Sequence, residues 1–345
     1  MQSFHQILKQ RLPNVRLTQL LIAINVIVFA AMLVGGAGFW HSPNGIQLTW
    51  GANFGPATQD GEWWRLGSAM FLHFGAMHLA LNCFALWDSG QLAERMYGHA
   101  RFLAIYLLSG LGGNLLSLVV QGNSAVSGGA SGAIFGVYAA VLVFLWRERA
   151  AIHAYEFRWL FGGGCAFALL TVVLGFVIPG IDNAAHIGGF ITGLLASIIF
   201  SQTITARSMP LKYSAGAALT TILASVLLFK NIPPPTYRWS DELLLRSQIS
   251  AFLYQDQAIN RSWLEIMHEG KQGKVSFDEL AGKIDYSISE PYEQSFERLS
   301  QLPTDPKLPS AAQLENILRY AEQRKEASKA LAERLREQAP LRKMN

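Results

Sequence analysis

The chain has 345 residues, of which 51% are apolar and only 15% are charged, and its mean hydropathy is +0.23. This composition excludes an ordinary soluble protein and predicts a membrane protein that is long enough for more than one domain. The net charge of +4 does not indicate nucleic-acid binding, because no basic cluster is interleaved with aromatic residues. The two cysteines, Cys83 and Cys165, lie far apart in apolar runs, so we expect neither a disulfide framework nor a metal site.

Acidic residues divide the chain into two parts. Seven of the 24 precede Lys230, and the other 17 follow it. We therefore predict a membrane part followed by a soluble tail. The tail has helical patterns at 241–254 and 311–336 and a turn signal at 270–273, which predict a small helical domain.

Seven uncharged apolar runs predict seven transmembrane helices. The first covers 17–36 and, at about 1.5 Å per residue, can cross roughly 30 Å of hydrocarbon. Its length distinguishes it from a cleaved signal peptide. The other runs cover 68–87, 102–120, 132–146, 159–180, 184–200 and 213–229. Each contains a small or polar residue, which favours a tightly packed bundle.

The loops between these runs predict the orientation. Ten Lys and Arg residues, Arg207 among them, fall on the side of the N-terminus, and only Arg65 falls on the opposite side before the tail. The positive-inside rule then places the N-terminus in the cytoplasm, and the odd number of spans places the tail outside. The long tryptophan-rich loop at 37–67 is predicted to lie at the outer interface and to be functional.

The segment from Gly128 to Gly136 carries the central candidate residue, Ser131. Two interpretations are open for this serine. It is one more small residue of a helix-packing face formed with Gly132 and Gly136, or it is a nucleophile at a helix N-terminus whose free N–H groups face developing negative charge.

A candidate base lies in the sixth run. His186, Gly189 and Gly193 share one helix face, so the imidazole points to where a neighbouring helix can approach closely. If this face meets the Gly132/Gly136 face, Ser131 and His186 come within hydrogen-bond reach. A proton relay or a packing residue is the alternative interpretation of this histidine. Asp182 is predicted to cap the helix, which leaves a Ser-His dyad without a third member.

Further polar residues lie in the second run. His78 and Asn82 are four residues apart and share a helix face, where both can donate hydrogen bonds to an oxyanion. His73 cannot share that face closely, and we assign it to supporting the entry loop.

Together these motifs resemble those of the rhomboid intramembrane serine proteases. The resemblance rests on His73-x4-His78-x3-Asn82, Gly129-x-Ser131-Gly132 and His186-x2-Gly189-x3-Gly193, and on a Trp-Arg motif at Trp64-Arg65. It covers about residues 15–205 and implies an all-α, polytopic six-helix core. It also implies Ser131 as nucleophile, His186 as base with Phe135 under its ring, and an oxyanion site from His78, Asn82 and the Ser131 backbone N–H.

The implied reaction is cleavage of single-pass membrane proteins at or just inside the outer edge of the lipid bilayer, without a cofactor or metal. The resulting domains are a cytoplasmic lead at 1–16, the rhomboid-like core at 17–205, a linker and seventh transmembrane helix at 206–230, and a soluble helical region at 231–345. Binding of an unidentified protein partner by 231–345 is a hypothesis with no motif behind it. The alternative functions are a catalytically silent rhomboid-like protein that escorts membrane clients, and a proton-relaying transporter, which predicts paired acidic residues in the bundle.

Overall fold

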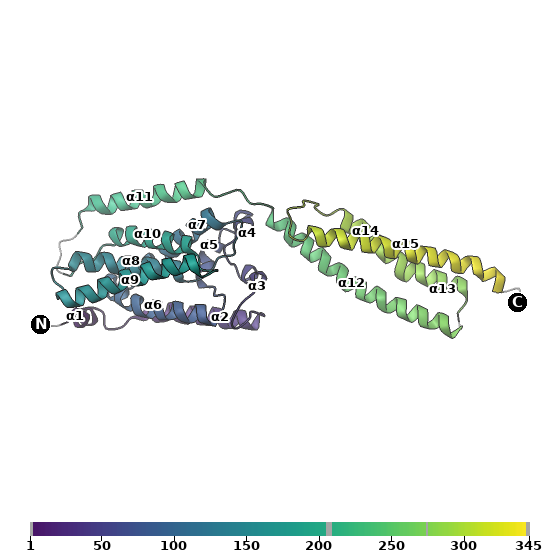
Figure 1. Cartoon of the computed structure of the whole chain (residues 1–345), viewed down its shortest axis with the longest axis horizontal. Coiled ribbons are helices and arrows are strands. Elements are labelled where there is room, and N and C mark those ends of the chain that lie inside the picture. Colours follow the sequence, from purple (N-terminus) through teal and green to yellow (C-terminus); the bar gives the residue numbers. More distant parts are fainter. Residues whose placement is uncertain (1–2, 205–208, 274, 343–345) are drawn as a thin grey trace. The chain divides into compact units, whose positions relative to one another are not determined.

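The computed structural model describes residues 3–204, 209–273 and 275–342. Two sequence predictions fall outside these residues. They are the domain boundary between residues 205 and 206, and the position of Arg207, which the charge count includes. Within the described ranges the regular secondary structure is helical, and one isolated antiparallel bridge joins Asn53 and Ser127 (Figure 1). The all-α fold class is confirmed. The chain forms two compact units, Met1–Pro235 and Thr236–Asn345.

The first unit holds the membrane helices. Among the described residues, five helices have the length and apolar character needed to cross a bilayer: α2 (Arg16–Val34), α7 (His99–Gln121), α8 (Ser131–Glu148), α9 (Ala154–Val177) and α11 (Leu211–Lys230). A bent pair, Arg65–Phe71 with Ala76–Tyr97, makes a sixth candidate, and α10 (Asn183–Ile199) is a shorter apolar helix. These elements fall on the seven predicted runs, and the protein is a multi-pass membrane protein.

The second predicted span is wrong as a single helix over 68–87. α5 (Arg65–Ser68) and the short η1 (Ala69–Phe71) are followed by a break, and α6 (Ala76–Tyr97) then starts at an angle of 91°. The break is fixed by the loop that precedes it, because Ser42 N–H donates to the Phe74 carbonyl and Ala76 N–H donates to the Phe39 carbonyl. A Cβ atom added at Gly75 would lie 2.2 Å from the Trp40 carbonyl oxygen, so this approach requires glycine.

The same helix α6 also extends ten residues beyond Trp87, to Tyr97. The helix can continue into the protein because its charged residue Glu94 is hydrogen-bonded there. The buried Glu94 carboxylate accepts hydrogen bonds from the backbone N–H groups of Leu17 and Thr18, at 2.9 and 2.8 Å, and from the Thr18 hydroxyl at 2.6 Å. It thereby caps the first turn of α2, whose N–H groups have no partner within the helix.

The N-terminal lead is helical rather than extended. α1 (Phe4–Arg11) begins with a capping box formed by Ser3 and Gln6, and Phe4 and Leu8 are buried in the main hydrophobic core. Two apolar residues one turn apart give this short helix a face to bury. The lead is therefore part of the packed unit.

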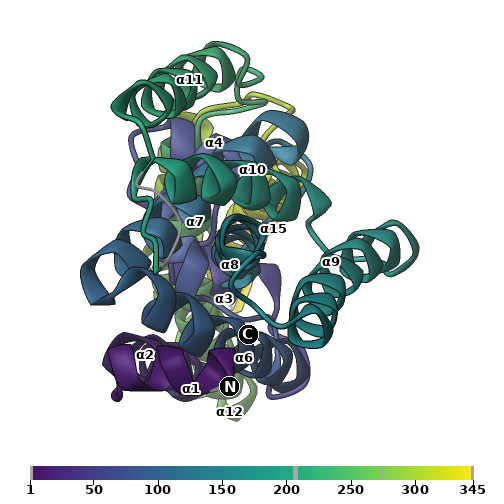
Figure 2. The ribbon, with the colours of Figure 1, turned by 90° about the vertical axis from the view of Figure 1, so that its left-hand side faces the viewer.

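α8 lies in the middle of the first unit, and α9 lies at its edge (Figure 2), where Phe167 stacks on Tyr138 of α8. The glycine faces of α8 and α10 meet: a Cβ atom at Gly189 would lie 2.0 Å from the Gly132 carbonyl oxygen, and one at Gly193 would lie 2.2 Å from the Gly136 Cα. A second close approach joins α7 to α10, where a Cβ atom at Gly113 would lie 2.6 Å from the Ala185 carbonyl oxygen. Such backbone contacts let helices pack without large side chains.

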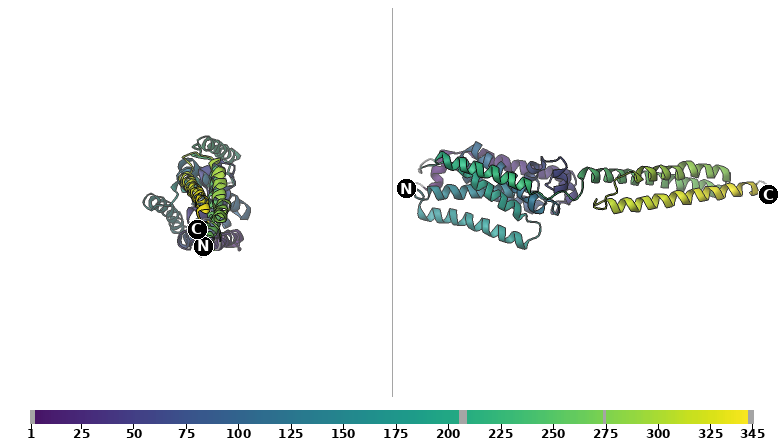
Figure 3. Two further views of the ribbon diagram at one scale, coloured as in Figure 1. Left: turned by 90° about the vertical axis from the view of Figure 1, so that its right-hand side faces the viewer. Right: turned by 90° about the horizontal axis from the view of Figure 1, so that it is seen from above.

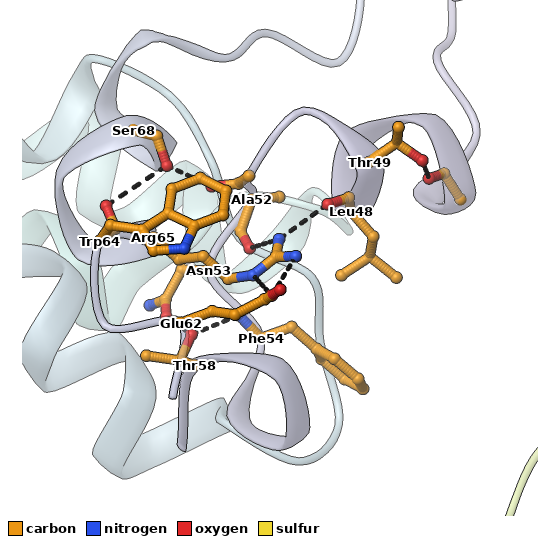
Figure 4. Close-up of polar contacts among 12 residues, drawn as sticks. Leu48, Thr49, Ala52, Asn53, Phe54, Thr58, Glu62, Trp64, Arg65 and Ser68 are labelled. Atoms are coloured by element: carbon orange, nitrogen blue, oxygen red, sulfur yellow. Dashed lines mark hydrogen bonds and ion pairs between the residues drawn. The ribbon is translucent and has the colours of Figure 1, made fainter. Parts of the chain in front are cut away.

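The 37–67 loop folds around Arg65. It contains two short helices, α3 (Asn44–Thr49) and α4 (Gly55–Gln59). The Arg65 guanidinium is buried and donates to the carbonyls of Leu48 and Ala52, at 2.7 and 3.0 Å, and to the Glu62 carboxylate (Figure 4). One cation thus satisfies several loop acceptors, which makes the loop a compact structure.

Contacts within the first unit show which segments share an end of the bundle. At one end, Arg11 donates to Gln202 and Thr203. At the other end, Gln59 donates to the Pro233 carbonyl and Asn123 donates to the Pro234 carbonyl. The chain therefore leaves this unit at the end that carries the 37–67 loop and the 122–130 loop.

The helices of the second unit lie side by side (Figure 3). α12 (Trp239–Gln272) and α15 (Ala311–Arg342) are long, and the segment between them contains α13 (Phe277–Ile284), the π-helical turn η2 (Asp285–Ser289) and α14 (Glu290–Ser300). α12 ends at Gln272, and its C-cap Gly273 is left-handed with φ +66°. The helix therefore breaks only at the last residue of the predicted 270–273 turn, whose first three residues are helical. The π turn directly precedes Pro291 in the first turn of α14, where the ring has no N–H to continue the α pattern.

Candidate active site

Ser131 and His186 are in contact. Ser131 is the first residue of α8, and His186 lies in the first turn of α10. The Ser131 Oγ atom is 2.9 Å from His186 Nε2, and the imidazole is 4% exposed. The close approach of Gly132 to Gly189 brings the two helix starts together, so the backbone packing sets this distance.

The His186 ring is fixed by a stacking contact on its face and by the contact between its Nε2 atom and Ser131. It stacks on Phe135, one turn into α8, with ring centroids 4.3 Å apart and planes 5° from parallel. Its Nδ1 atom is buried and has no hydrogen-bond partner among the described residues. With Nε2 facing the serine, the neutral ring that can act as a base is the tautomer with its proton on Nδ1.

His78 and Gly129 border the same space. His78 lies in the first turn of α6, and its Nδ1 accepts a hydrogen bond from the Phe74 N–H at 3.4 Å. This leaves Nε2 as the ring donor. Gly129 has φ +143°, and a Cβ atom there would lie 2.9 Å from His78 Nε2 and 3.8 Å from Ser131 Oγ. A donor and the hydroxyl are therefore on either side of a space that only glycine leaves open.

The remaining predicted donor, Asn82, is buried on α6, and its amide donates to the carbonyl of His78 at 2.9 Å. No direct contact joins Asn82 to Ser131 in the described structure. His73 precedes α6 in the break, is fully buried, and places its ring 5.1 Å from that of His78. Its carbonyl accepts from the Gln47 amide at 3.0 Å, which ties it to the 37–67 loop.

Trp64 and Arg65 lie away from the serine. Arg65 binds the loop carbonyls described above, and the half-exposed Trp64 ring packs on Gly51, where a Cβ atom would lie 2.3 Å from the indole. Gly51 has φ +97°, so glycine meets both the close approach and the backbone conformation. These two residues shape the loop, and the structure brings neither to the hydroxyl.

Sequence reasoning assigned only a capping role to Asp182, which the structure confirms through an Ala185 N–H bond of 2.9 Å. It missed that the carboxylate also accepts from Ser117, Gln121 and Ser127. The sequence shows that Ser117 and Gln121 lie one turn apart on one helix face, but it does not show that this face meets the start of α10.

The arrangement has the parts of a nucleophilic site. A hydroxyl lies against an imidazole that can take its proton. The first N–H groups of α8 have no intrahelical partners, and they lie beside a histidine donor where a negative oxygen would be stabilised. The described residues contain no group of three or more His, Cys, Asp or Glu side chains that could hold a metal ion.

The sequence matches a family model for the Rhomboid domain over residues 60–203. It is 35% identical over 211 residues to the rhomboid protease GluP of Bacillus subtilis, a match that covers 61% of this chain and 38% of GluP. It is 32% identical over 266 residues to the rhomboid protease AarA of Providencia stuartii, with 71% of this chain and 90% of AarA covered. RHOMBOID-like protein 5 of Arabidopsis thaliana is 36% identical over 149 residues, which is 45% of its length.

The chain thus spans less than half of two of these relatives and nearly all of AarA. The match to AarA extends well beyond the segment that holds Ser131 and His186. With a multi-pass helical bundle and the expected motifs in place, the chain belongs to the rhomboid family.

Proposed function

We propose that the protein is an intramembrane serine endopeptidase that hydrolyses peptide bonds in or near the transmembrane segments of single-pass membrane proteins. The observation that carries this proposal is the 2.9 Å contact between Ser131 Oγ and His186 Nε2 at the N-terminus of a membrane helix. A catalytically silent escort protein is not favoured, because both residues are present and touch each other. Paired acidic residues, which a proton-relaying transporter would need, are not seen in the sequence of the apolar runs.

In this mechanism Ser131 Oγ attacks the carbonyl carbon of the scissile bond while His186 Nε2 takes the hydroxyl proton. The imidazolium then gives that proton to the leaving amine, and the acyl group remains on Ser131. A water molecule, deprotonated by the same nitrogen, then attacks the ester, and the imidazolium returns this proton to Ser131 Oγ as the acid leaves. Phe135 keeps the ring plane fixed through both transfers by stacking on it.

The oxyanion is assigned to three donors: the backbone N–H of Ser131, the His78 Nε2–H and the Asn82 amide. The bond from Phe74 N–H to His78 Nδ1 supports His78, since it fixes the tautomer that can donate. Asn82 donates one hydrogen of its amide to the His78 carbonyl in this structure, so its second Nδ2 hydrogen is the one that serves the oxyanion.

The substrate would enter from the lipid bilayer and be cut near small residues close to the outer surface. The positive-inside count places the N-terminus in the cytoplasm and the 231–345 region outside the cell membrane. The exit of the chain at the Ser131 end of the bundle supports this arrangement. Recruitment of an unidentified protein by 231–345 stays a hypothesis.

Purified protein in liposomes should cleave a single-pass reporter substrate, whereas Ser131→Ala should show no cleavage above background. Loss of the nucleophile removes the covalent step, so a rate reduction of roughly 10⁶-fold is expected for chemistry through this serine. Thermal unfolding of both proteins in detergent serves as the control for folding. Equal cleavage by the two proteins would remove Ser131 from the mechanism.

A further inference from the structure

Asp182 binds more groups than a helix cap needs. Its Oδ1 atom accepts from the Ala185 N–H at 2.9 Å and from Gln121 Nε2 at 3.2 Å. Its Oδ2 atom accepts from the hydroxyls of Ser117 and Ser127, both at 2.5 Å. A carboxylate has about four lone-pair sites, and all four are used here. The two hydroxyl contacts have the short distance of bonds to an ionised acceptor.

These four donors come from three separate segments. Ser117 and Gln121 belong to α7, Ser127 belongs to the 122–130 loop, and Ala185 belongs to the first turn of α10. The Ser127 backbone also pairs in both directions with Asn53 of the 37–67 loop, at 2.9 Å each way. One side chain therefore links the outer loops to the helix start that carries His186.

The link bears directly on the Ser131–His186 distance. Ser127 precedes the nucleophile by four residues, and Gly128 and Gly129 lie between them. Two glycines add little stiffness of their own, so the loop before Ser131 needs an external anchor. On the other side, His186 N–H donates to the Asp182 carbonyl at 3.1 Å, which fixes the imidazole helix to the same residue.

We propose that Asp182 is a positioning residue that clamps the serine-bearing loop to the histidine-bearing helix and holds Ser131 at hydrogen-bond distance from His186. This inference rests on the proposed function. Asp182 acts through Ser127 and the α10 backbone and does not touch the His186 ring, whose Nδ1 has no partner among the described residues. It is therefore not the third member of a triad. Its negative charge also favours the imidazolium that forms when His186 takes the serine proton.

The test compares Asp182→Ala, Asp182→Asn and Ser127→Ala with wild type in the full-length protein. The readouts are the rate at which a fluorophosphonate labels Ser131, kcat and KM for the reporter substrate, and thermal unfolding. Asp182→Ala should lower the labelling rate and kcat by about 10- to 100-fold, because a displacement of about 1 Å at reacting atoms has this effect. KM should change less than about twofold, because the clamp acts on the geometry of the chemical step.

The other variants separate geometry from charge. Asp182→Asn keeps an oxygen for the Ala185 N–H and removes the charge, so its rates should fall between those of wild type and Asp182→Ala. Ser127→Ala should slow labelling by several-fold, and adding it to Asp182→Ala should have no further effect, because both changes break one clamp. Thr18→Ala is the matched control: it removes a buried hydroxyl from the Glu94 carboxylate and should lower only the thermal stability.

Wild-type labelling and kcat in folded Asp182→Ala would overturn the inference while leaving the proposed function intact. Losses of labelling rate and kcat in Asp182→Ala that are no larger than those in Thr18→Ala would also overturn it. If Asp182→Ala does not fold, the rates of Asp182→Asn and Ser127→Ala decide, and wild-type rates in both would contradict the clamp. If wild type is neither labelled nor active, the proposed function fails and this inference fails with it.

Discussion

At the residue scale, the site depends on which atoms are absent as much as on which are present. Gly129 has a left-handed φ, and its missing side chain leaves open the space between His78 Nε2 and Ser131 Oγ. Phe135 supplies the ring that fixes the plane of His186. A serine, two histidines, a glycine and a phenylalanine thus make up the candidate site.

Gly129→Ala should abolish activity by steric exclusion. The added Cβ atom would lie 2.9 Å from the His78 ring, and the backbone would adopt a strained φ at a cost of about 1 to 3 kcal/mol. We expect kcat/KM to fall by more than about 100-fold. The measurement is reporter cleavage at matched folded concentrations.

Gly61→Ala is the control for backbone strain alone, since Gly61 has φ +101° and no atoms within 4 Å of an added Cβ. It should destabilise the protein without lowering kcat/KM of the folded fraction. Equal loss of activity in the two variants would show that strain, and not the His78 contact, explains the effect.

At the element scale, the meeting of α8 and α10 is the feature that makes the site. Backbone-to-backbone contacts at Gly132/Gly189 and Gly136/Gly193 leave no room for a side chain. Association of helices in lipid depends on such packing, because there is no hydrophobic driving force between them. Glycine spacing along both helices therefore brings the serine and the histidine together, and the proposed Asp182 clamp acts on this contact from the loop side.

Gly193→Ala should push α10 away from α8, because its Cβ atom would lie 2.2 Å from the Gly136 Cα. Overpacking of this kind costs about 1 to 3 kcal/mol or more, so we expect a lower unfolding temperature and slower fluorophosphonate labelling of Ser131. Gly216→Ala on α11, where an added Cβ atom meets nothing within 4 Å, should leave both unchanged. A wild-type labelling rate in Gly193→Ala would show that the helix contact does not set the site.

Spacing along one helix could be read from the sequence, and contacts between elements could not. The small faces of 132/136 and 189/193 and the pairing of His78 with Asn82 follow from helical periodicity. The break at Leu72–Gly75 depends on the backbone hydrogen bonds between the 37–67 loop and the residues around the break, and no local sequence pattern predicts these bonds. The extension of α6 to Tyr97 likewise depends on Glu94 finding the start of α2, and the role of Asp182 depends on three segments meeting.

At the scale of the whole molecule, different chain segments lie at the two ends of the first unit. One end holds α1 and the 202–203 segment, joined through Arg11. The other end holds Ser131, the 37–67 loop and the exit at Pro233 and Pro234. These contacts and the charge count support the proposed orientation, in which the number of crossings is odd and the site lies on the outer side of the membrane.

Single-cysteine labelling tests this orientation. With Cys83 and Cys165 replaced by alanine, Gln10→Cys should react with a membrane-impermeant maleimide only after the inner membrane is opened. Gln272→Cys, at the exposed end of α12, should react in cells whose inner membrane is intact. Labelling of both sites from the same side would contradict an odd number of spans.

The account depends on Ser131 being a nucleophile activated by His186, and mass-spectrometric mapping of fluorophosphonate labelling tests this directly. Wild-type protein should carry the adduct on Ser131 alone, and His186→Ala, shown to be folded by thermal unfolding, should carry none. An adduct on another residue, or undiminished labelling of Ser131 in His186→Ala, would contradict the proposed dyad.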